Sequence, residues 1–106
     1  MKLWVDDLRK PPKGYRWAKS VNEAKKMIID YETMYLASGK KDFYKIEVIN
    51  LDHDAGDYVN DGGDYIKLLC WLERTGRNYP IHIHTANVVG RMNMEAIIKY
   101  NGWEEV

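Results

Sequence analysis

The chain contains almost no cysteine, carries no net charge and has no long apolar run, and each of these absences excludes a class of protein. Its single cysteine, Cys70, has no partner for an internal disulfide, which favours a reducing environment and a cytoplasmic location. No apolar run approaches the ~20 residues of a membrane span, and no apolar signal core opens the chain, so we expect no membrane partner. Because the 16 basic and 16 acidic side chains cancel, an anionic ligand must be held by a local cluster.

What is present is an ordinary globular composition in which short apolar runs alternate with helical patterns. With 106 residues, 45% of them apolar and 30% charged, the chain is expected to form one domain over residues 1–106. The patterns predict strands at residues 2–5, 15–19, 43–51, 81–85 and 103–106, and helices at about residues 21–36, 65–76 and 91–100.

Strands that alternate with helices predict an α/β fold with a mostly parallel, five-stranded sheet. We expect helices on both faces of this sheet, which makes a small three-layer α/β/α sandwich. The helix expected between the first two strands is missing, because Pro11, Pro12 and Gly14 predict a loop there.

Three of the predicted strands end in acidic or imidazole side chains, which are Asp6 and Asp7, then Asp52, His53 and Asp54, and then His84. In an open parallel sheet the carboxyl ends of the strands meet at one edge, where ligands bind. The sequence therefore predicts a site at this edge. The alternative is that these acids merely begin polar loops.

Four carboxylates, Asp6, Asp7, Asp52 and Asp54, are candidate ligands of a metal ion. Clustered carboxylates repel one another unless a positive charge compensates, and a hard divalent cation prefers such oxygen ligands. The expected cofactor is therefore a divalent metal, Mg²⁺ or Mn²⁺. Histidine and aspartate together also suit Zn²⁺, but no spacing in this chain is diagnostic of zinc.

Imidazoles near the predicted site are candidates for acid–base catalysis, because the unperturbed pKa of histidine is ~6.5. His53 and His84 lie at strand ends, and with Asp52 they form the candidate catalytic set. His82 shares a face of its strand with His84 but lies deeper, which is typical of a hydrogen-bonded structural residue.

Polar donors near the same edge are candidates for binding phosphate, and they are Arg9, Thr85, Asn87, Arg91 and Asn93. Such donors, together with the first backbone N–H groups of a helix, form a phosphate cradle. The alternative is that Thr85 and Asn87 are turn residues and that Arg9 makes a solvated salt bridge.

Five segments of the chain carry a resemblance to a known family. They are WVDDLR at residues 4–9, PKGY at residues 12–15, AKSVNEA at residues 18–24, LDHDAG at residues 51–56 and HTANVVGRMNM at residues 84–94. Together they resemble the motifs of the cyclic-phosphate processing receiver-like family, whose proposed activity is the processing of cyclic phosphates on nucleotides or RNA ends. The resemblance implies a receiver-like (flavodoxin-like) fold over nearly the whole chain.

The resemblance also assigns roles to matching positions. Asp6 and Asp7 match the metal-binding acidic pair of receiver domains, Asp52 matches the phosphoacceptor, and Thr85 lies near the position of a hydroxyl residue. Two departures count against phosphosignalling. The segment 102–106 lacks the lysine with which a receiver holds the phosphoryl group, and no final helix follows it. The predicted site also carries His53 and His84, which a phosphoacceptor does not require and an acid–base hydrolase does.

The sequence thus favours a metal-dependent phosphoesterase whose ligand is a phosphate ester or cyclic nucleotide, including RNA ends. A non-catalytic phosphoacceptor and a module that binds a cyclic nucleotide without cleaving it stay open as alternatives, as does the oligomeric state. Tyr15 and Trp17 on a possible edge strand suit a dimer or a ligand equally well.

Overall fold

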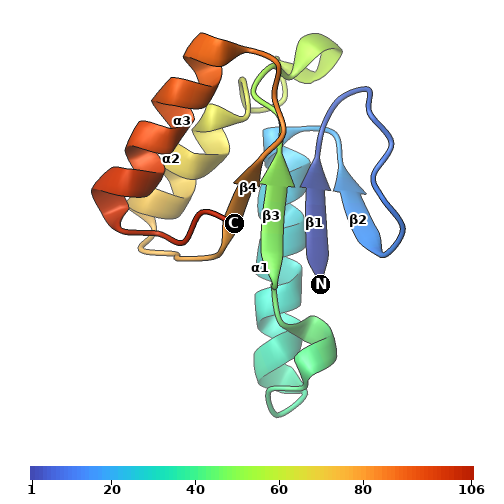
Figure 1. The fold of residues 1–106 in the computed structure, drawn as a ribbon. Helices are drawn as coiled ribbons and strands as arrows, with labels where there is room; N and C mark the ends of the chain where they lie inside the picture. Colours follow the sequence, from blue (N-terminus) through green and yellow to red (C-terminus); the bar gives the residue numbers. More distant parts are fainter.

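A computed structural model describes all residues, 1–106, as a parallel sheet with three α-helices (Figure 1). The strands are β1 (Lys2–Val5), β2 (Tyr15–Ala18), β3 (Val48–Leu51) and β4 (Ile81–Ile83). The α-helices are α1 (Val21–Ala37), α2 (Ile66–Arg74) and α3 (Val88–Asn101), and two short 3₁₀ turns, η1 (Asp42–Tyr44) and η2 (Gly56–Tyr58), lie before and after β3. None of the helices is both long and apolar enough to cross a membrane.

The strands lie in the order β2-β1-β3-β4, and every pair is parallel. The α/β class and the receiver-like parallel sheet predicted from the sequence are therefore confirmed. The sheet differs from the prediction in having four strands rather than five. The segment expected to form the fifth strand contributes only one parallel bridge, between Ile81 and Glu105.

The core lies on one face of the sheet. Leu3 and Val5 on β1 point into a single buried apolar cluster. The strand residues in register with them belong to the same cluster, and they are Ile49 and Leu51 on β3 and Ile81 and Ile83 on β4. All three α-helices contribute to the same cluster, with Ile28 from α1, Leu69 from α2 and Met94 from α3. Figure 1 shows α1 behind β1 and β3, with α2 and α3 side by side beyond β4.

The opposite face carries no helix, so the molecule has two layers where the sequence analysis expected three. The reason lies in the direction of the connections. From β2 through β3 and β4 to Glu105, each step moves the same way along the sheet, and right-handed crossovers in one direction place every helix on one face. Only the step from β1 to β2 reverses, and residues 6–14 make that step as a loop.

Several element boundaries also differ from the prediction, and three of these differences affect β3, β4 and α3. The residues before β3 form η1 and an extended connection, so only the last part of the predicted strand 43–51 pairs with β1. The fourth strand ends at Ile83, which leaves His84 and Thr85 in the following loop. Helix α3 begins at Val88 instead of Arg91, because the side chain of Asn87 accepts a hydrogen bond from the Gly90 N–H and caps the helix.

Candidate functional site

Three carboxylates meet at the carboxyl ends of β1 and β3. Asp6, Asp7 and Asp52 each offer an oxygen, and these oxygens lie within 4.8 Å of one another. The two strands are adjacent, and Val5 pairs with Leu51, so the residues that follow them are brought to the same place. The structure thus brings together three of the four acids that the sequence analysis proposed as metal ligands.

Asp6 is almost fully buried at the base of this cluster. Its Oδ1 accepts hydrogen bonds of 2.9 Å from the backbone N–H groups of Leu8 and Arg9. Burial by itself raises the pKa of the Asp6 carboxyl, but these two amides and the His84 ring outweigh it and hold the pKa below its usual value. Asp6 is therefore a stable carboxylate, and it also shapes the loop that follows β1.

Asp7 has the opposite titration behaviour. Burial, and then the negative charges of Asp6 and Asp52, raise the pKa of its carboxyl. A Cβ atom at Gly56, where φ is +55°, would lie 2.2 Å from Asp7 Oδ2, so only glycine allows the two segments to approach this closely.

The His84 ring contacts Asp6 of the acidic cluster and two residues of the sheet, Trp4 and Asn50. Its Nε2 lies 2.8 Å from Asp6 Oδ2, and its Nδ1 bonds the side-chain amide of Asn50. The ring stacks on Trp4, with ring centres 3.8 Å apart and planes 7° from parallel. Burial lowers the pKa of His84, partly offset by Asp6. Both ring nitrogens are thus engaged within the protein, which suits a residue that positions Asp6.

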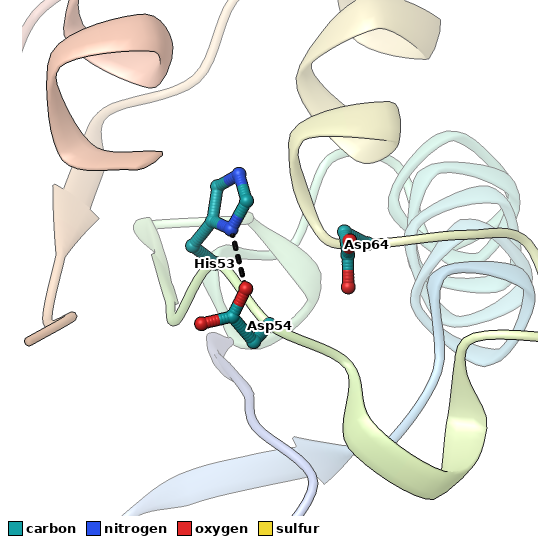
Figure 2. Close-up of side chains that lie close together, drawn as sticks. All are labelled: His53, Asp54 and Asp64. Carbon is teal, nitrogen blue, oxygen red and sulfur yellow. Dashed lines mark hydrogen bonds and ion pairs between the residues drawn. The ribbon is translucent and has the colours of Figure 1, made fainter. Parts of the chain in front are cut away.

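His53 occupies a different environment at the N-terminus of α3. Its Nδ1 lies 2.9 Å from Asp54 Oδ1, and its Nε2, on the far side of the ring, has no hydrogen-bond partner within the chain (Figure 2). The hydrogen bond from His53 lowers the pKa of the Asp54 carboxyl. The ring packs against Gly90, where a Cβ atom would lie 2.5 Å from it, so α3 can begin beside the imidazole only with glycine at this position.

Asp54 groups with His53 and Asp64 instead of joining the three-carboxylate cluster. Asp64 approaches the His53–Asp54 pair from the side toward α2 (Figure 2), and one ligand atom from each of the three residues lies within 4.8 Å of the others. Asp64 Oδ1 accepts a hydrogen bond from the Ala55 N–H, so it supports the loop that carries the pair.

The predicted phosphate-binding residues are placed unequally. Arg9 reaches toward the His84 carbonyl, with 3.5 Å between Nη1 and oxygen. Asn87 Nδ2 lies 3.3 Å from Asp54 Oδ2, which ties the cap of α3 to the His53–Asp54 pair. These side chains therefore lie at the predicted edge of the sheet.

The other three predicted phosphate ligands have structural contacts or none. The Thr85 hydroxyl accepts a hydrogen bond from the Asn87 N–H, and Arg91 Nη2 donates to the Ile83 carbonyl at 3.0 Å, so both stabilise the loop after β4. Asn93 is exposed in the second turn of α3 and makes no side-chain hydrogen bond.

Sequence reasoning missed Asn50 and Trp4, which hold the His84 ring. A signal for Asn50 was available, because an amide inside the apolar run of β3 is unusual and has to find a partner. Trp4 had no such signal, since a tryptophan in a strand fits an ordinary core equally well.

The low pKa of Asp6 leads to a prediction for acid stability. A carboxyl whose pKa is depressed in the folded protein stabilises it above the unfolded pKa of ~3.9, and this contribution is lost as the pH falls through the folded value. With a chelator present, the unfolding free energy of the wild type should fall more steeply below pH 4 than that of Asp6→Asn, by up to ~1.4 kcal/mol per pH unit, the limit for one proton.

Urea titrations followed by tryptophan fluorescence from pH 2 to 6 would measure this difference. The acid dependence due to the Glu32–Arg77 ion pair should persist in both proteins, because hydrogen bonds from Arg77 and Tyr79 outweigh burial and lower the pKa of Glu32. Equal slopes for the two proteins would contradict the assignment to Asp6.

Comparison with known proteins gives one family. The model of a family described as the cyclic-phosphate processing receiver domain matches residues 1–100 of this chain. No curated protein and no solved structure matches it.

Proposed function

The chain belongs to the family of cyclic-phosphate processing receiver domains, and we propose that it hydrolyses a cyclic phosphate ester with the help of a divalent metal ion. The observation that carries this proposal is the meeting of two different groups at one edge of the sheet. One group is the cluster of Asp6, Asp7 and Asp52, and the other is the His53–Asp54 pair. The first suits a cation and the second suits proton transfer.

The three-carboxylate cluster fits a hard divalent ion such as Mg²⁺ or Mn²⁺. Its donors are all oxygens, and the charges of Asp6 and Asp52 add to burial in raising the pKa of Asp7. Asp6 Oδ1 accepts hydrogen bonds from two amides, so Asp6 offers Oδ2, which also lies 2.8 Å from His84 Nε2, while Asp7 and Asp52 offer their carboxylates. When bound, such an ion would polarise the phosphoryl oxygens and neutralise the charge that develops on them.

His53 is the better of the two histidines for moving protons. Asp54 holds Nδ1 as a donor, which leaves Nε2 as a base, the arrangement by which a carboxylate fixes the tautomer of a catalytic imidazole. In hydrolysis, His53 would take a proton from the attacking water and return one to the sugar oxygen as its bond to phosphorus breaks. His84, with both nitrogens engaged, would position Asp6.

The ester itself would be held from the α3 side and from the β1 loop. The backbone N–H groups of Val88 and Val89 begin α3, where the helix dipole favours an anion, and neither has a partner within the chain. Arg9 would add a guanidinium from the loop after β1, while Thr85 and Arg91 would keep the loop after β4 in place.

A non-catalytic binding module is the second candidate. It is favoured by His84, because a buried imidazole with both ring nitrogens engaged is built for stability rather than for turnover. Such a module would capture the cyclic phosphate at the same edge and release it unchanged. A phosphoacceptor role for Asp52 would instead appear as phosphoryl transfer from a small donor such as acetyl phosphate.

The decisive experiment is hydrolysis of 2′,3′- and 3′,5′-cyclic nucleotides with and without metal. We expect turnover with Mg²⁺ or Mn²⁺, its loss on chelation, and its recovery when the ion is added back. Turnover that survives chelation would contradict the requirement for a metal ion. Binding of a nucleotide that is not cleaved would favour the non-catalytic binding module.

A further inference from the structure

The face of the sheet without helices is the largest feature that the proposed function leaves unused. We call it the helix-free face and define it by the outward side chains of the strands, which are Lys2, Trp4, Tyr15, Trp17, Val48, Asn50 and His82. Trp4 and Asn50 are buried, but the other members are exposed or partly exposed. A soluble parallel sheet is normally covered on both faces, so this surface calls for an explanation.

The surface combines aromatic rings with cations. On β2, Tyr15 and Trp17 point outward two residues apart, which places neighbouring rings on the same face. Lys19 Nζ lies 4.7 Å from the centre of the Trp17 ring, and Lys2 Nζ lies 5.9 Å from the centre of the Tyr15 ring. Each partly exposed ring therefore has an ammonium group over one of its faces.

Charge in this part of the chain is strongly one-sided, although the whole chain is neutral. Residues 1–19 hold six basic side chains and only two acidic ones, Asp6 and Asp7, both of which belong to the candidate site. The basic side chains are Lys2, Arg9, Lys10, Lys13, Arg16 and Lys19. They lie on β1, on β2, in the loop between the two strands and directly after β2, which is the edge strand of the sheet, so the local field there attracts polyanions.

The helix-free face runs directly into the candidate site. Trp17 Nε1 donates a 2.8 Å hydrogen bond to the Asp6 carbonyl, and Trp4 Nε1 donates one of the same length to the Arg9 carbonyl. Trp4 also stacks on His84. A chain lying on this face would therefore lead to the carboxylates at the ends of the strands.

We propose that the helix-free face binds single-stranded RNA through stacking on Tyr15 and Trp17 and through contacts of Lys2, Lys19 and the neighbouring basic side chains with phosphates. Exposed aromatic rings on a sheet accept unpaired bases of any sequence, and basic side chains follow the backbone. A second copy of this chain fits less well, because pairing two such faces would bring like charges together.

This inference deepens the proposed function and, where it concerns the substrate, rests on it. A 2′,3′-cyclic phosphate forms only on a ribose that has a 2′-hydroxyl. The substrate class is then an RNA strand that ends in a cyclic phosphate, with its last nucleotides on the helix-free face and its terminal phosphate at the site. A free mononucleotide lacks the neighbouring bases that this face would hold.

Binding is tested without any need for catalysis. We would measure the anisotropy of a labelled, unstructured RNA octamer with an ordinary 3′-hydroxyl at several salt concentrations. Trp17→Ala and Tyr15→Ala should each weaken binding about tenfold, the effect of losing one stacked base. Tyr100→Ala, which removes an 86% exposed tyrosine on α3, is the matched control and should bind as the wild type does.

Two further variants guard against a folding artefact, because Trp17 also bonds the Asp6 carbonyl. Trp17→Phe keeps a stacking ring and should retain most of the affinity. The double variant Lys2→Ala/Lys19→Ala leaves the rings in place and should lower both the affinity and its salt dependence, whereas Lys99→Ala on α3 should do neither.

A second arm compares hydrolysis of an octamer that ends in a 2′,3′-cyclic phosphate with hydrolysis of the cyclic mononucleotide. We expect the wild type to prefer the octamer at least about tenfold in kcat/KM and Trp17→Ala to lose that preference. Octamer binding without any hydrolysis would support the helix-free face and contradict the proposed function. Hydrolysis of the cyclic mononucleotide without binding of the octamer would support the proposed function and contradict RNA binding at the helix-free face. A homodimer that Trp17→Ala dissociates would assign the face to a second copy and overturn the proposal.

Discussion

Asp52→Asn is expected to lower hydrolysis of a cyclic phosphate by more than about 100-fold while the protein stays folded. Replacing a group that only orients a metal ligand already lowers activity or metal affinity 10- to 100-fold, so loss of a ligand should exceed that range. The fold should persist because an asparagine oxygen can still accept the 2.7 Å hydrogen bond from the His53 N–H.

The electrostatics sharpen this prediction. Burial, and after it the charges of Asp6 and Asp52, raise the pKa of Asp7. Removal of the Asp52 charge should therefore relieve repulsion within the cluster and leave the thermal stability of the metal-free protein equal to that of the wild type or higher. Calorimetric Mg²⁺ or Mn²⁺ titration would show weaker binding. The matched control is Asp42→Asn, the same change at an exposed acid in η1, which should alter neither activity nor metal affinity.

Asp52 is a better test than Asp6. Two backbone amides and the His84 ring depend on the Asp6 carboxylate, so a change there alters the loop after β1 as well as the charge. If Asp52→Asn keeps full metal-dependent activity, the three-carboxylate cluster is not the metal site and the proposed function is wrong in that respect.

His53→Gln should lower kcat by roughly 10²- to 10⁴-fold, the usual contribution of a general acid or base, with little change in KM. The reason is that Nε2 has no partner within the chain while Asp54 holds Nδ1 (Figure 2).

His84→Gln provides the contrast. Both nitrogens of His84 are engaged, so its loss should weaken metal affinity and lower stability through Asp6 and Asn50, while kcat falls less than in His53→Gln. Two results together would reverse the assignment of the histidines. These are a His53→Gln protein with an unchanged kcat and a folded, metal-binding His84→Gln protein that has lost kcat.

The two histidines show why a sequence motif and a site are not the same thing. Both lie directly after apolar runs, and from the sequence they are equivalent candidates. In the structure, His84 is stacked on Trp4 and bonded to Asp6, while His53 packs against Gly90 and pairs with Asp54. The difference comes from segments far away in the chain, since residues 6 and 50 hold one ring and residue 90 receives the other.

The sequence by itself determined the parallel α/β class, the order of the elements and the three-carboxylate cluster. It did so because apolar periodicity reports local structure, and because neighbouring parallel strands must bring Asp6, Asp7 and Asp52 to one edge. It did not determine that all three helices share one face, since periodicity shows that a helix buries a stripe but not which face of the sheet that stripe meets.

That choice depended on the tertiary structure, through the direction in which each crossover moves along the sheet. The same is true of Asp54, which the chain places with His53 rather than with the other acids, and of the closing segment, which makes one bridge at Glu105 where a strand was expected. Each is decided by which distant segments become neighbours. The physical reason is that packing is a property of pairs of elements, whereas the patterns in a sequence describe the elements one at a time.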